Sequence, residues 1–429
     1  MNLSALSTEQ SPPIALPFAF FAVAPLFLLL AALLLLTAAD APFAAPHTPE
    51  LLAATHAITL GCVAAVMLGA LQQILPVLVG SPLRGARGVA GSVWMLWLAG
   101  ALALVAGFRF GLPPLLHAAW GLLGSAFAIF ITACLISLAR APARNITWLG
   151  LLLAFLSLAV AVVLGALLAH GYASGLALPY AAWAALHIKL ALGGWVLLLI
   201  VGVSYQVVPM FQLTPAYPAW LTRLLAPLLF ASLLLSIAAR GAGYEPLATA
   251  GEILFWSLAI SFAVVTLQLQ RQRRRQVADT TLDFFRSGML ALLFAAAASL
   301  LARGCPLTHD SLRLLSALAF VLGFAWSVIC GMLYKIMPFL VWFHLFRGGM
   351  QAGIPNMKQI IPARWMRWHY RVQLATLLAA AGVPFWPSAS TALALGLLAQ
   401  GLLLGAAVLT AWRIYRSHLR RLAQPASAA

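Results

Sequence analysis

The sequence predicts an all-α polytopic membrane protein, and three observations indicate this fold class. The 429 residues are 64% hydrophobic and only 8% charged, whereas a soluble chain carries about 25% charged residues. Long apolar runs recur along the whole chain, and about 20 mostly apolar residues are enough for a helix to cross a bilayer. One short motif also recurs three times at nearly equal intervals. We therefore expect residues 1–429 to form a single integral membrane domain.

Twelve runs are long and apolar enough to be spans, with boundaries that are soft by several residues. They cover residues 14–38, 53–80, 89–108, 114–139, 147–169, 180–209, 220–239, 248–268, 286–303, 311–346, 370–387 and 389–412. The first run is interpreted as a span, because it is too long for a signal peptide, lacks a basic leader and has no clear cleavage site. An even number of spans puts both termini on one side of the membrane.

The net charge of +17 could suggest a nucleic-acid partner, but the distribution of the charge argues against one. With the N-terminus inside, nineteen of the 25 Lys and Arg residues fall in inside segments and four in outside segments, while Lys189 and Lys335 lie within spans. Cytoplasmic loops retain Lys and Arg. We therefore expect a multi-pass protein of the cell's inner (plasma) membrane with both termini cytoplasmic, the lipid bilayer as partner and no nucleic acid.

The recurring motif has the form G-x7-G-x6-P and occurs in the second, sixth and tenth runs. Its residues are Gly61, Gly69 and Pro76, then Gly194, Gly202 and Pro209, then Gly323, Gly331 and Pro338. Four spans fit between successive motifs. The sequence thus predicts three pseudo-repeated four-helix units, approximately residues 14–139, 147–268 and 286–412. Chance is the alternative, because glycine is common in membrane helices.

The motif has a simple physical interpretation. Glycines eight residues apart lie nearly on one helix face, where they allow a neighbouring helix or a flat cofactor to approach closely. The proline kinks or ends the span. Three helices with this motif are expected to line the inner ring of a threefold bundle.

This architecture resembles subunit I of the heme-copper oxidase and nitric oxide reductase superfamily. The stretches GALQQILPVL (69–78) and GMLYKIMPFL (331–340) look like the ends of the second and tenth helices in its reductase-like members. The resemblance implies a respiratory-chain protein of electron transport, with heme b near the outer face. In that family the second helix carries a heme-binding His and the sixth a copper-binding His, and His56 and His187 occupy the comparable regions here.

The chain departs from the family at other ligand positions. The family's tenth helix carries a His-x-His pair, but the comparable stretch LLSALAF (314–320) has no His, and the seventh run also has none. We therefore expect a divergent member that lacks most copper and heme ligands. It is not expected to be a competent terminal oxidase or nitric oxide reductase on its own, and copper is a candidate without a full ligand set.

Most histidines are expected near the outer face, and imidazole is a common ligand of heme iron and copper. These six are His47, His56, His117, His170, His187 and His309. His56, His187 and Lys189 are the candidate cofactor-binding residues, and His56, His187 and His309 are the candidate metal ligands; no catalytic residue is identified. The alternative is that a His at a helix end is only interfacial. His56 and His187 also lie at different distances from their glycines, which predicts that their rings do not occupy equivalent faces.

Lys189 lies inside the sixth run and needs a counter-ion or a route to the interface. Glu252, at the start of the eighth run, is the best protein partner. A heme propionate or another anionic ligand is the functional alternative. Lys335, near the cytoplasmic end of the tenth run, is interpreted as a snorkelling lysine.

Three functions remain open at this point. The first is a heme b-binding protein for electron transfer or gas sensing. The second is a heme-free transporter or a metal- or heme-handling accessory protein. The third is a structural subunit of a respiratory complex, with other respiratory or cytochrome subunits as partners. The concentration of His near the outer face favours the first, and the missing His-x-His pair weakens it.

Overall fold

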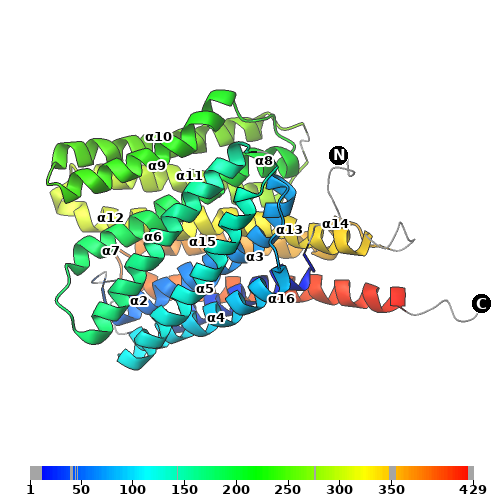
Figure 1. Cartoon of the computed structure of the whole chain (residues 1–429), viewed down its shortest axis with the longest axis horizontal. Coiled ribbons are helices and arrows are strands. Elements are labelled where there is room, and N and C mark those ends of the chain that lie inside the picture. The colour runs from blue at the N-terminus through cyan, green and yellow to red at the C-terminus, as the bar shows by residue number, and fades with distance from the viewer. Residues whose placement is uncertain are drawn as a thin grey trace, which may run out of the picture.

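The computed structural model describes residues 12–38, 42–43, 45, 47–142, 144–274, 277–346 and 354–423. All regular structure within these residues is helical. Eleven of the described helices are long and apolar enough to cross a membrane, and they run side by side as one bundle (Figure 1). The prediction of an all-helical protein with many apolar spans is confirmed.

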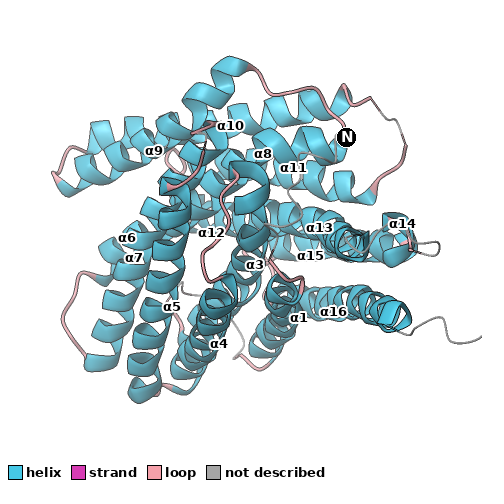
Figure 2. Ribbon diagram, turned by 45° about the vertical axis from the view of Figure 1, so that its right-hand side comes forward, coloured by secondary structure: helices cyan, strands magenta, loops and turns pink. Residues whose placement is uncertain are grey.

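Nine helices form a closed peripheral ring in which each helix packs against the next. The contact between α16 and α1 closes the ring. In ring order they are α1 (Ala15–Leu36), α4 (Ala86–Phe110), α5 (Pro113–Ala139), α6 (Ile146–Ser174), α9 (Ala219–Gly241), α10 (Glu245–Arg271), α11 (Thr280–Leu301), α15 (Ala363–Gly382) and α16 (Ala389–Ala423). The short α14 (Met357–Ile360) precedes α15. Loops join the helix ends (Figure 2).

Three further spans, which we call the inner spans, lie inside this ring. The first inner span comprises α2 (Pro49–His56), η3 (Ala57–Ala64), α3 (Ala65–Ile74) and η4 (Leu75–Val79). The second comprises α7 (Tyr180–Ile188), η5 (Lys189–Leu197) and α8 (Leu198–Gln212). The third comprises α12 (His309–Leu318), η7 (Ala319–Ala325) and α13 (Trp326–Phe346), and the short η6 (Pro306–Thr308) precedes it. In their most apolar stretches 83%, 61% and 72% of residues are buried, against 33% in α6 and α10. The inner spans are therefore the core of the bundle.

Each inner span contains a π-helical segment that includes the first glycine of its motif. Gly61 lies in η3, Gly194 in η5 and Gly323 in η7. A π-helix has i→i+5 hydrogen bonds, is rare, and occurs frequently at functional sites. The apolar pattern of the sequence gave no sign of these segments.

The motif glycines bring each inner span close to one peripheral helix. Gly61 and Gly69 face α1, Gly194 and Gly202 face α6, and Gly323 and Gly331 face α11. At Gly202 the contact is backbone to backbone, because an added β-carbon would lie 3.2 Å from the Cα of Gly150. Of the two uses proposed for these glycines, the structure shows helix packing.

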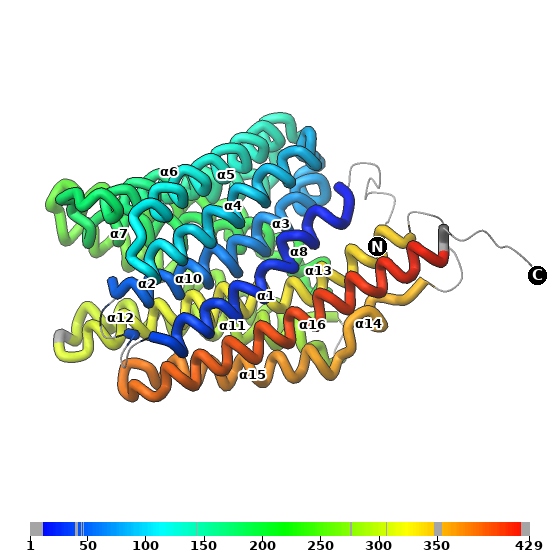
Figure 3. Tube along the Cα trace, turned by 90° about the horizontal axis from the view of Figure 1, so that it is seen from below, coloured from blue at the N-terminus to red at the C-terminus, as the bar shows by residue number. Residues whose placement is uncertain are grey.

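The two ends of the bundle differ. The start of α1 and the end of α16 lie together at one end, and α2, α7 and α12 lie at the opposite end (Figure 3). We call the first the proline end, because the motif prolines lie toward it, and the second the histidine end, because His56, His187 and His309 lie there.

Two predicted boundaries were wrong. The eleventh predicted run, 370–387, corresponds to α15, which begins seven residues earlier at Ala363. Its first turns carry Arg364, Arg367 and Arg371, and α15 is not among the eleven apolar helices. The last run was predicted to end at residue 412, but α16 continues to Ala423 through an arginine-rich end.

Candidate functional site

His56 is the last residue of α2 and directly precedes η3. Its Nδ1 lies 2.7 Å from the carbonyl oxygen of Leu52. Because a carbonyl only accepts hydrogen bonds, Nδ1 carries the proton and Nε2 presents its lone pair. The ring stacks on Phe108 of α4, with 5.6 Å between ring centroids and 29° between planes, so two contacts fix its orientation.

His187 has the same hydrogen-bonding arrangement on a different helix. Its Nδ1 lies 2.8 Å from the carbonyl oxygen of Ala161 in α6, which again assigns the proton to Nδ1. Its ring packs against Gly165, where an added β-carbon would lie only 2.9 Å from Cε1 of the imidazole. Gly165 therefore provides the space that the ring of His187 occupies.

The structure places His56 and His187 at the same end of the bundle, on neighbouring inner spans. A charge on one imidazole would be felt by the other, and their different spacing from the motif glycines predicts that the rings occupy non-equivalent faces. Within the part of the chain that is described, neither Nε2 has a hydrogen-bond partner in the protein. A His that donates Nδ1–H to a carbonyl is oriented for ligation through Nε2. The pair therefore forms a candidate two-imidazole site.

Lys189 follows in the same inner span and belongs to a cluster of charges around Glu252, which we call the Glu252 cluster. The carboxylate of Glu252 pairs with both Lys189 and Arg303, and Arg240 lies 3.2 Å from it. Arg303 also donates to the hydroxyl of Thr249 at 2.9 Å. The predicted Lys189–Glu252 pair is confirmed, and it is one arm of a larger cluster.

The Glu252 cluster carries more positive than negative charge. Glu245 pairs with Arg240 at 3.4 Å, and Arg313 is near enough to act electrostatically on Arg303. Partial burial, and then the charges of Arg240 and Arg313, lower the pKa of the Arg303 guanidinium below its usual value. Three cations thus pair with two carboxylates, and Arg313 adds a fourth positive charge nearby, so the site can accept a further anion.

His309 begins α12 at the same end of the bundle. Its Nδ1 donates to the carbonyl oxygen of Ala302 at 2.7 Å. Among the described residues there is no group of three or more His, Cys, Asp or Glu side chains placed to hold a metal ion. The three candidate metal ligands thus lie at one end of the bundle, and the described residues offer no complete set for copper.

A second histidine pair was missed by the sequence analysis, which treated its members separately. The rings of His117 in α5 and His170 in α6 lie 5.3 Å apart, centroid to centroid. Trp120 donates to Nδ1 of His117 at 3.4 Å. The signal was present, because α5 begins and α6 ends at the same end of two adjacent antiparallel helices.

Two residues have protein partners that the sequence did not predict. His369 directly precedes the predicted run 370–387, but it lies within α15, is fully buried and bonds through Nδ1 to the hydroxyl of Tyr334 at 2.8 Å. Lys335 was interpreted as snorkelling, but its ammonium donates to the carboxylate of Asp279 at 2.7 Å. His369 was misplaced because α15 begins earlier than predicted. The partner of Lys335 was missed because Asp279 is far from it in sequence.

Comparison with models of known protein families gave no match, and comparison with curated proteins gave none either. The site therefore has to be interpreted from its own chemistry. That chemistry consists of two oriented imidazoles and a neighbouring cluster with excess positive charge.

Proposed function

We propose that the chain is a heme-copper-oxidase-subunit-I-like membrane protein that binds one heme b near the outer face of the plasma membrane, for electron transfer or gas sensing. One observation carries this proposal. His56 and His187 lie at the same end of the bundle, and each holds its Nδ1–H on a backbone carbonyl. This is the state in which imidazole ligates heme iron.

The neighbouring residues suit an anionic, flat cofactor. His56 and His187 would hold the heme iron, and Phe108 keeps the ring of His56 in one orientation. Lys189 and the arginines of the Glu252 cluster would pair with propionate carboxylates. When bound, a heme supplies one-electron redox chemistry and an iron that binds small gases.

We further propose that the bundle consists of three four-helix units and twelve spans, with both termini in the cytoplasm. The two glycines of each motif contact the first helix of the same unit, namely α1, α6 or α11. The start of α1 and the end of α16 share one end of the bundle, as an even number of spans requires when α15 is counted. The excess of Lys and Arg assigns the proline end to the cytoplasm.

Oxygen reduction is not part of the proposal. The family's His-x-His pair has no counterpart at residues 314–320, and α9 lacks the adjacent histidines of the family's seventh helix. The proposed activity is therefore confined to electron transfer or gas binding at one heme.

A heme-free accessory protein or structural subunit is the second candidate, and one hydrogen bond favours it. Ser316 occupies the same position before its motif glycine as His187, and its hydroxyl donates to the carbonyl of Ala295 in α11 at 2.8 Å. His187 makes the corresponding bond to α6. In this interpretation the imidazole joins two helices and holds no iron.

An absorption spectrum of the protein purified from heme-replete cells separates the two candidates. We expect a Soret band with sharp bands after dithionite reduction, and one heme b per chain in a pyridine extract. His56→Ala and His187→Ala should each abolish or shift these bands, and His418→Ala, near the end of α16, should not. A folded but colourless protein, or spectra unchanged in both variants, would overturn the heme proposal.

A further inference from the structure

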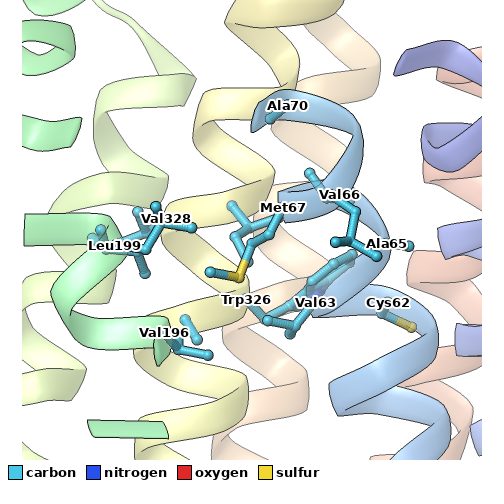
Figure 4. Packing of buried hydrophobic residues seen from close by; sticks show 14 of the residues in the cluster. Cys62, Val63, Ala65, Val66, Met67, Ala70, Val196, Leu199, Trp326 and Val328 are labelled. Atoms are coloured by element: carbon cyan, nitrogen blue, oxygen red, sulfur yellow. The ribbon is translucent and has the colours of Figure 1, made fainter. Parts of the chain in front are cut away.

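The axis of the bundle is apolar. Where the three inner spans meet, Met67 of the first points toward Leu199 and Val328 of the other two (Figure 4). The small cavity there, of about 120 Å³, has no charged residue in its wall. No Lys or Arg among the described residues is buried. A site for a charged ligand beyond the Glu252 cluster therefore has to lie on the surface.

One exposed face of α15 carries a row of arginines followed by leucines, and we call this face the α15 stripe. Arg364, Arg367 and Arg371 are exposed, and Leu374 and Leu378 follow with 39% and 77% of their surface exposed. Intervals of three and four residues place all five side chains on one side of the helix. The stripe is thus charged toward the proline end and apolar toward the histidine end.

The innermost arginine of the α15 stripe lies deep in the bilayer. As one of the twelve proposed spans, α15 ends at Gly382, eleven residues after Arg371, a rise of about 16 Å. The hydrocarbon core of a bilayer is about 30 Å thick. Phe385 and Trp386 are exposed just beyond the end of α15, and aromatic residues of this kind lie at membrane interfaces. Arg371 is therefore at the level of the lipid hydrocarbon.

The neighbouring α16 carries an arginine row with the same spacing at the usual depth. Arg413, Arg416 and Arg420 repeat the intervals of three and four residues and are exposed. They follow the apolar residues 389–412, which are enough to cross the membrane. The arginines of α16 therefore lie beyond the hydrocarbon core, at the proline end.

The packing of α15 against α16 shows the same difference in depth. The two helices are antiparallel neighbours, and Gly396 of α16 packs against Thr376 of α15. Arg371, five residues before Thr376, is therefore level with residue 401, twelve residues before Arg413. At 1.5 Å per residue, the innermost arginine of α15 lies about 18 Å deeper than that of α16.

The part of the protein that is described provides no anion for the arginines of the α15 stripe. Residues 354–423 contain no Asp or Glu, and none of the ion pairs among the described residues includes these arginines. Two carboxylates lie at the start of the neighbouring α11, but Asp279 pairs with Lys335, and the charge of Arg286 acts on Asp283. An arginine within the hydrocarbon is costly unless it has such a partner.

A tryptophan directs the innermost arginine toward the lipid headgroups. The guanidinium of Arg371 lies over the ring of Trp368, 5.0 Å from its centroid, and a cation in this position is attracted by the face of the indole. Trp368 is about one turn nearer the proline end, which is about 5 Å along the axis. This reach leaves the guanidinium short of the membrane surface, so a phosphate has to come to it.

We propose that the α15 stripe binds one anionic phospholipid of the surrounding membrane. Its phosphate is held by Arg364, Arg367 and Arg371, and one of its acyl chains lies along Leu374 and Leu378. Arginine presents two parallel N–H groups to a phosphate and keeps its charge. A zwitterionic headgroup has its own ammonium beside the phosphate, which the arginines repel, so the stripe selects a lipid of net negative charge. The site is separate from the histidine end and does not depend on heme.

The double variant Arg367→Gln/Arg371→Gln tests the proposal. Arg416→Gln/Arg420→Gln on α16 is the matched control, because it removes the same charge outside the hydrocarbon. Dioleoyl phosphatidylglycerol and dioleoyl phosphatidylethanolamine are titrated onto the delipidated protein in a neutral detergent, and native mass spectrometry counts the bound lipids. We expect phosphatidylglycerol to bind about tenfold more tightly than phosphatidylethanolamine, and the α15 variant, but not the control, to lose this advantage. Equal losses in the two variants would overturn the proposal, because net charge alone would then explain binding.

A second measurement on the wild-type protein guards against misfolding of the variant. Phosphatidylglycerol should raise the melting temperature more than phosphatidylethanolamine does at the same concentration, because a ligand of the folded state stabilises it. Inorganic phosphate should not displace the lipid, since it has no chain to lie along the leucines. Displacement by inorganic phosphate would mean a site for small anions only, and equal effects of the two lipids would mean no selection of the headgroup. Either result overturns the proposal. Heme content is recorded for each sample, so that a failure of the heme proposal is seen separately.

Discussion

At the scale of single residues, Glu252 is the one carboxylate in the described part of the chain that three cations share. Replacing it by Gln should leave Lys189 and Arg303 without their partner in a half-buried setting. We expect a loss of about 1–3 kcal/mol of unfolding free energy, as for hydrogen bonds to charged groups, measured by thermal unfolding of the purified protein. Glu245→Gln is the control, because Glu245 is 64% exposed and its one ion pair among the described residues is with Arg240 at 3.4 Å; it should change stability by less than about 0.5 kcal/mol. Equal effects of the two substitutions would contradict a central role for Glu252.

Asp279 predicts a pH dependence at the other end of the bundle. Burial raises the pKa of its carboxyl, but the hydrogen bond and the charge of Lys335, together with hydrogen bonds from Thr281, outweigh burial and leave the pKa of Asp279 below its usual value. A depressed carboxyl pKa stabilises the fold above the unfolded pKa of about 3.9, and this stability is lost as the pH falls through the lower folded value.

We therefore expect the melting temperature of the wild-type protein to fall below about pH 4 by more than that of Asp279→Asn, which has already lost the ion pair. Asp310→Asn, at an exposed position, is the control and should follow the wild-type curve. Parallel curves for wild type and Asp279→Asn between pH 7 and pH 3 would show that the Lys335 pair contributes nothing.

At the scale of helices, the close approach of α8 and α6 makes a sharp prediction. Gly202→Leu would force a side chain against the backbone of Gly150, whereas Leu198→Ala only leaves a void. We expect Gly202→Leu to cost more than the roughly 1–3 kcal/mol typical of overpacking, because backbone atoms cannot yield. Gly124→Leu is the matched control, since nothing lies within 4 Å of its added β-carbon. Wild-type-like melting of Gly202→Leu in detergent would contradict the packed arrangement.

The helices themselves were largely predictable, and their internal irregularities were not. Apolar runs identify the spans because the bilayer imposes both length and composition. The π-helical segments at Gly61, Gly194 and Gly323 depend on how each inner span packs, which a hydropathy pattern does not record. The early start of α15 was missed because its first turns carry arginines.

In the candidate site, too, some features were predictable from the sequence and others were not. Lys189 and Glu252 were paired in advance because a charge inside a span needs one of very few available partners. The orientations of His56 and His187 could not be predicted, because spacing was counted as α-helix and both histidines lie beside π-helical segments. The pairing of His117 with His170 needed the tertiary adjacency of α5 and α6.

At the scale of the whole molecule, the orientation in the membrane can be tested without new cysteines. Cys305, between α11 and α12 at the histidine end, is exposed, and the other three cysteines are buried. We expect a membrane-impermeant maleimide to label intact spheroplasts, and Cys305→Ala to abolish the labelling. Labelling only after lysis would place the histidine end in the cytoplasm and reverse the proposed topology.

The π-helical segments also set a rotation within each inner span. They determine in which direction the side chains before the segment point, relative to the side chains after it. A π turn holds about one residue more than an α turn, so deleting Ala64 at the end of η3 would let the segment return to α-helix. The lost residue and the tighter turn would offset each other, so His56 would keep its direction about the span axis. Inserting one alanine after Ala64 would instead turn everything before it by about 100°, with Gly69 and Pro76 in place. The insertion should therefore turn His56 away from His187 without any change to either histidine, and the deletion should not; the opposite result would refute this view. The π-helical segment between His56 and Gly69 is thus as much a part of the site as the imidazoles.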